Sequence, residues 1–169
     1  EVVEETADSV TIRDLLDSAE LSVNSAVERM RLISLSMLED AVRALEEENR
    51  DLARDVVERD DDVDRLWYVV SRIFRSTLRS PAIAQELGIS REDCFDFHTS
   101  ARQLERIADH AVKISNETLE LDDEVPPEVM ESLLSLYEMS ADIIDTAMEA
   151  LFESDEEAAT TLANAAREA

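Results

Sequence analysis

Two pairs of acidic residues are the best candidates for chemistry in this chain of 169 residues. Asp60 and Asp64 are four residues apart, and so are Glu105 and Asp109. Residues four apart lie on one side of an α-helix, so each pair would hold two carboxylates close together. Carboxylates that converge repel one another unless a bound cation or a raised pKa relieves the repulsion. A cation is the simpler solution, and the two pairs therefore predict a metal-ion site.

The segments that carry the pairs have the periodicity of long helices. Apolar side chains recur at three- and four-residue steps over residues 51–80 and again over residues 91–121. At about 100° per residue, each pair lies beside the apolar stripe of its helix, in the same rotational sense. If the two helices are antiparallel neighbours, the end of the first lies beside the start of the second. The two acidic pairs then lie roughly 27 Å and 24 Å from that end of the helix pair, a difference of less than one turn. We expect all four carboxylates on one side of this helix pair, at the border of the core.

Acidic residues are so common in this chain that a purely solvated role has to be considered. Asp and Glu account for 42 residues, and chance alone would produce roughly ten acidic pairs with this spacing, most of them facing solvent. The two pairs are expected at a similar height and on the same side of the helix pair, and this coincidence favours an ion site over a purely solvated role. A di-iron carboxylate enzyme is a further alternative, but the Glu-x-x-His pattern that it needs does not occur in the sequence.

Composition predicts an all-α fold. One glycine and three prolines leave few helix breakers, and the scarcity of β-branched and aromatic residues argues against a sheet. Residues 10–16 could form a short strand or a turn. The expected caps and breaks are Asn49, Gly88, Ser90 with Asp93, Pro126-Pro127, and Ser154 with Glu157. The helices expected between them cover about 22–47, 51–80, 82–87, 91–121 and 127–152, with a further helix starting at Ser154.

The net charge of −26 limits the partners of this domain. Such an excess of carboxylates repels nucleic acids and anionic membranes, so we expect no direct nucleic-acid binding. Acidity with a single lysine, Lys113, suits a salt-rich cytosol in which charges are screened within about 3 Å. One cysteine, Cys94, provides no disulfide framework, and no apolar run is long enough to span a membrane. These features predict a cytoplasmic protein of halophilic type.

The remaining candidate side chains have simpler interpretations. His98 is expected to be a solvated or capping histidine, and His110 a surface residue. Trp67 and Tyr68 are expected in the core and at its rim rather than in a binding site.

A weak internal repeat organises the chain. Residues 41–53 resemble residues 147–159 in the placement of alanine, leucine and glutamate. The repeat predicts an antiparallel three-helix bundle over residues 22–121 and an incomplete second copy over residues 127–169. Residues 1–21 would be a lead-in segment or a linker from a further N-terminal domain. We expect a homo-oligomer, in which a partner chain completes the missing helix.

Two sequence motifs resemble those of the phosphate-uptake regulator family, PhoU. Residues 103–112, which read QLERIADHAV, resemble the family signature, with Ala108 in place of a glycine. Residues 57–66 resemble the family's other motif, an acid followed four residues later by an aspartate. The resemblance covers roughly residues 22–169 and points to an archaeal or halophilic member.

The resemblance implies a non-enzymatic regulator of phosphate uptake and phosphate homeostasis. Such proteins act through the ATPase subunit of a phosphate transporter or through a signalling protein, and their acidic motifs bind iron or zinc clusters. By match, these motifs fall on Asp60, Asp64, Glu105 and Asp109, whose oxygen ligands would also suit Mn²⁺, Mg²⁺ or Ca²⁺. Some archaeal members carry an AbrB-type DNA-binding domain, so one alternative is a dimerisation bundle attached to a transcription regulator. The other is a structural bundle whose acids keep it soluble in brine.

Overall fold

The computed structural model describes residues 2–5, 10–12 and 22–153. Strands in the described part form one antiparallel hairpin, β1 (Val2–Glu5) with β2 (Val10–Ile12), which settles the strand-or-turn alternative at residues 10–12 in favour of a strand. The rest is helical and confirms the all-α prediction. The helix expected from Ser154 lies outside the described residues. The helices are α1 (Val23–Glu46), α2 (Arg50–Arg79), α3 (Pro81–Glu86), α4 (Arg91–Glu120) and α5 (Pro127–Glu153).

Local sequence signals set the helix boundaries. The side chain of Asn49 accepts a hydrogen bond from the Leu52 amide at 3.0 Å and caps α2. Ser90 accepts one from the Asp93 amide at 2.9 Å and caps α4. Gly88 follows α3 with a φ of +64°, a left-handed conformation that glycine adopts without a steric penalty. These predicted boundaries are confirmed to within a residue or two.

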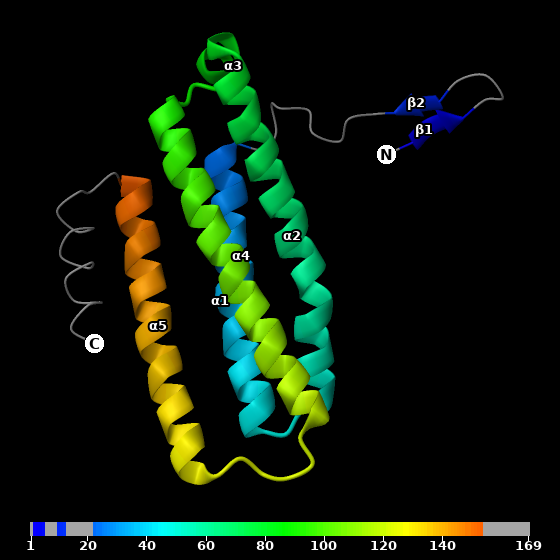
Figure 1. Cartoon of the computed structure of the whole chain (residues 1–169), viewed down its shortest axis with the longest axis vertical. Coiled ribbons are helices and arrows are strands. Elements are labelled where there is room, and N and C mark those ends of the chain that lie inside the picture. The colour runs from blue at the N-terminus through cyan, green and yellow to red at the C-terminus, as the bar shows by residue number, and fades with distance from the viewer. Residues whose placement is uncertain (1, 6–9, 13–21, 154–169) are drawn as a thin grey trace.

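The core lies between α1, α2 and α4, which pack against one another as three long neighbours (Figure 1). Their inward faces carry apolar residues at helical spacing, so each helix can bury one stripe. The largest fully buried apolar side chains come from all three helices: Met30, Met37, Val27, Val56, Val63, Val70, Leu104 and Cys94.

Helix α5 lies alongside this three-helix unit, mainly against α1 and in part against α4 (Figure 1). Arg31 of α1 holds it by donating to Asp145 Oδ1 from Nε at 2.9 Å and from Nη2 at 2.6 Å. Val129, Leu136 and Met139 of α5 remain exposed. Its place in a second repeat over residues 127–169 stays a prediction. Within the described residues, no helix combines the length and the hydropathy that crossing a membrane requires.

Candidate functional site

The four predicted carboxylates are Asp60 and Asp64 of α2 and Glu105 and Asp109 of α4, and we call them the carboxylate cluster. All four side chains are half-buried, whereas Asp61 beside them is exposed. They occupy the border between core and solvent because they flank the apolar stripes of two helices that pack against each other. This is the position that the helical periodicity predicts.

Asp60 shows that the cluster converges in space. Burial raises the pKa of Asp60 above its usual range, and the nearby charges of Asp64, Asp109, Glu105 and Asp61 raise it further. Asp109 and Glu105 belong to the other helix, so charges from both α2 and α4 act on Asp60. Negative charges that approach from two helices create a site whose electrostatics favour a cation.

Glu105 is the member of the cluster that has a buried oxygen without a hydrogen-bond partner in the described part of the chain. Its side chain is only 13% exposed, and its Oε1 accepts a hydrogen bond from Arg102 Nη1 at 2.5 Å. Its Oε2 is buried and finds no hydrogen-bond partner among the residues that the structure describes. A buried carboxylate oxygen without a donor is unfavourable, because it has lost its water and gained nothing in return. Among the described residues, however, no group of three or more His, Cys, Asp or Glu side chains is arranged to hold a metal ion.

Arg102 links the cluster to a row of rings between α2 and α4. Its guanidinium carbon lies 5.6 Å from the centre of the Trp67 ring, within the range of a cation–π contact. The sequence interpretation missed this residue, although its position three before Glu105 on one helix allows the ion pair.

The row of rings continues from Trp67 toward the α3 end of the bundle. The ring centres of Trp67 and His98 are 4.8 Å apart, and His98 stacks on Phe74 with a centre-to-centre distance of 4.4 Å. The ring centres of Phe74 and Phe95 are 6.1 Å apart. Phe95 is 54% exposed, so the row reaches the surface. We call Trp67, His98, Phe74 and Phe95 the aromatic row.

The prediction of a solvated or capping His98 was wrong. His98 is half-buried between two rings of α2, and burial together with the charge of Arg75 lowers the pKa of His98 below its usual value. Both rings belong to α2, whereas His98 belongs to α4, so the sequence around His98 does not indicate that rings cover it. Trp67 is partly buried against the core, Tyr68 is 69% exposed at its rim, and His110 is exposed, as predicted.

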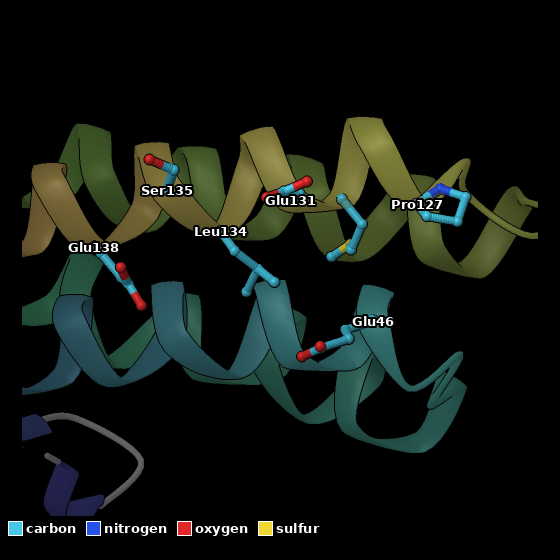
Figure 2. Close-up of a pocket in the computed structure, with 7 residues that line it drawn as sticks. Glu46, Pro127, Glu131, Leu134, Ser135 and Glu138 are labelled. Atoms are coloured by element: carbon cyan, nitrogen blue, oxygen red, sulfur yellow. The ribbon is translucent and has the colours of Figure 1, made fainter.

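A groove lies between α1 and α5 in the surface of the bundle. It is a shallow, open hollow of about 470 Å³, and Leu134 and Glu138 extend from α5 toward α1 within it (Figure 2). Its charged lining residues are three glutamates, Glu46, Glu131 and Glu138. Within residues 22–153, none of these three glutamates belongs to a hydrogen bond or ion pair that would fix its direction, so the groove lacks the converging polar groups of the carboxylate cluster.

Fold and site together define an all-α helical-bundle protein with a carboxylate cluster at the edge of its core. The family model of the PhoU domain matches residues 27–118, which is more than half of the chain, and the chain belongs to the PhoU family. The matched residues run from α1 to α4 and include all four carboxylates. Neither a curated protein nor a solved structure matches the chain significantly.

Proposed function

We propose that this protein is a non-enzymatic regulator of phosphate uptake whose carboxylate cluster binds metal ions. Membership of the PhoU family supports the regulatory role. The single observation that supports metal binding best is the convergence of the carboxylates from α2 and α4 around Asp60. Carboxylates that approach one another repel, and a ligand of opposite charge would relieve that repulsion.

The chemistry of the donor set fits a metal ion. Asp60, Asp64, Glu105 and Asp109 would supply oxygen ligands, which suit iron, Mn²⁺, Mg²⁺ and Ca²⁺ and can also bind zinc. The unpartnered Oε2 of Glu105 supports the assignment, because a cation would supply the interaction that this buried oxygen lacks. By family resemblance, iron or zinc is the metal that we propose.

The regulatory step would be binding to another protein. We propose that the bundle contacts the ATPase subunit of a phosphate transporter or a signalling protein in the cytoplasm, and that the chain forms homo-oligomers. The exposed apolar side chains Val129, Leu136 and Met139 on α5 support protein–protein contact, since they leave apolar surface in water.

Metal analysis combined with thermal unfolding tests the proposed metal site. The purified protein should contain iron or zinc, or bind it after reconstitution, and a chelator should lower its melting temperature because a ligand that binds only the folded state stabilises it. The variant D64N/D109N should lose the bound metal and the effect of the chelator. It removes two charges from the cluster while keeping the size of the side chains.

The matched control is E58Q/D62N, which removes two charges four residues apart from the exposed side of α2. It should retain the metal and the response to chelator. Equal loss of metal from both variants would mean that the ion is held by the general negative charge of the protein. A metal-free protein that melts identically with and without chelator would refute the metal site and leave only the family's regulatory role.

A further inference from the structure

We propose that Arg102 is the internal counter-ion of the carboxylate cluster, and that a metal ion bound there displaces Arg102 from Glu105 and thereby changes the surroundings of Trp67. This inference rests on the proposed metal site. It adds a role for Arg102 and a physical connection between the cluster and the aromatic row.

The two oxygens of Glu105 have different environments. Oε1 is paired with Arg102, whereas Oε2 is buried and has no donor. Arg102 therefore compensates only part of the charge that converges on the cluster. A divalent cation that binds both Glu105 and a carboxylate of α2 would compensate more of that charge and would compete with Arg102 for the same carboxylate.

The ion pair that has to open is exposed on its arginine side. The Arg102 side chain is 49% exposed and is three residues from Glu105 on the same helix. The Glu105 side chain is only 13% exposed, so its carboxylate would need the metal ion in place of Arg102, whereas water can solvate the released guanidinium. A guanidinium at this position can leave the carboxylate without becoming buried or unsolvated.

The other contact of Arg102 makes its displacement observable. Its guanidinium carbon is 5.6 Å from the centre of the Trp67 ring. The same guanidinium contacts both the indole and Glu105, so a shift of Arg102 would change the electric field at the indole and its exposure to water. Trp67 is also in contact with His98, the next ring of the aromatic row. Occupancy of the cluster would thus be transmitted to the side chains that lead to the exposed Phe95.

Tryptophan fluorescence provides a direct test, because Trp67 is the only tryptophan of the chain. The full chain, freed of metal by a chelator and then dialysed, is titrated with Zn²⁺ alone. Calorimetry reports binding, and tryptophan emission is recorded over the same titration. We expect a saturable change in emission whose midpoint coincides with that of the binding isotherm.

The variant R102Q should affect Zn²⁺ binding and the change in tryptophan emission in opposite directions. It should bind Zn²⁺ about two- to fivefold more tightly, since the substitution removes a competing cation whose ion pair with Glu105 is exposed on the arginine side. Its tryptophan emission should respond much less to Zn²⁺. The matched control is R106Q, which removes the same charge from α4 at an exposed residue whose Nη1 donates to Gln103 at 3.3 Å. R106Q should retain the emission change.

The possible outcomes separate this inference from the proposed function. Zn²⁺ binding without a change in emission would overturn the role of Arg102 and leave the metal site intact. Weaker binding by R102Q than by R106Q would also overturn it, because Arg102 would then position Glu105 rather than compete with the ion. Absence of Zn²⁺ binding by a protein whose circular dichroism shows a folded bundle would overturn both proposals.

Discussion

Replacing Asp60 by asparagine should stabilise the metal-free protein and weaken its stabilisation by metal. Asp60 is half-buried and faces the charges of Asp64, Asp109 and Glu105. Asparagine has nearly the same size and no charge, so the substitution removes repulsion without creating a cavity. An increase in stability on removing a charged residue would indicate that the cluster is arranged for a ligand rather than for folding.

The magnitude follows from the number of repelling neighbours. Like charges four apart on a helix cost roughly 0.2–0.5 kcal/mol each. Asp60 has one such neighbour on α2, Asp64, and two on the adjacent helix α4, Asp109 and Glu105. D60N should therefore raise the free energy of unfolding by roughly 1 kcal/mol at low ionic strength. For a domain of this size, that corresponds to an increase in melting temperature of about 2–4 °C.

The assay is thermal unfolding by circular dichroism, in chelator and in excess metal. A ligand at one hundred times its dissociation constant adds about 2.7 kcal/mol to the stability of the protein that binds it. Wild type should therefore melt below D60N in chelator and above it in metal. The control is D62N, which loses an exposed carboxylate paired with Arg65 at 3.0 Å and should show no such reversal. A D60N variant that melts below wild type in chelator would show that the charge of Asp60 does not destabilise the metal-free protein.

Two further contacts and the net charge provide additional tests. Replacing Arg31 by glutamine should loosen α5, because Arg31 donates two hydrogen bonds to Asp145; amide exchange in α5 should accelerate roughly two- to fivefold relative to α1. The folded-state pKa of His98 lies below its unfolded value, so the stability that the neutral imidazole contributes is present above about pH 6.5 and is lost as the pH falls below that value. Wild type should accordingly lose stability relative to H98F between about pH 7 and pH 5, measured by denaturant unfolding. Raising KCl from about 0.1 M to 1 M should increase the melting temperature, because the screening length falls from about 10 Å to 3 Å around a chain of charge −26.

Each of these tests has an internal comparison. R54Q removes an exposed arginine that pairs with Asp51 within α2 and should leave exchange in α5 unchanged. Equal exchange in R31Q and R54Q would contradict the role assigned to Arg31. Parallel pH profiles of wild type and H98F would show that His98 does not titrate differently in the folded state. For the salt effect, E58Q/D62N should respond less than wild type, since it carries two fewer negative charges.

The helix boundaries illustrate what short-range signals predict well. Asn49 and Ser90 cap the amides of residues three positions ahead, and Gly88 adopts a left-handed conformation just after α3. Each of these features depends on a residue and its immediate neighbours, so tertiary context hardly alters it. The half-buried position of the carboxylate cluster could be predicted for a similar reason, since the helical period relates each acid to the apolar stripe of its own helix.

The contacts across the seam between α2 and α4 could not be predicted in this way. Phe74 covers His98, and Arg102 lies over Trp67. Both contacts depend on the relative rotation and height of the two helices to within a few ångströms. Sequence periodicity determines a face but not that precision, because many side-chain packings are compatible with the same stripe.

The amino-acid sequence by itself determined the helical architecture, the caps, and the pairing of acids at the edge of the core, because all three follow from residues within one or two turns of each other. Tertiary structure alone decided that Glu105 keeps one oxygen buried without a partner and that His98 lies between two rings. These features arise from atoms of separate helices, which only the packing of α2 against α4 brings into contact.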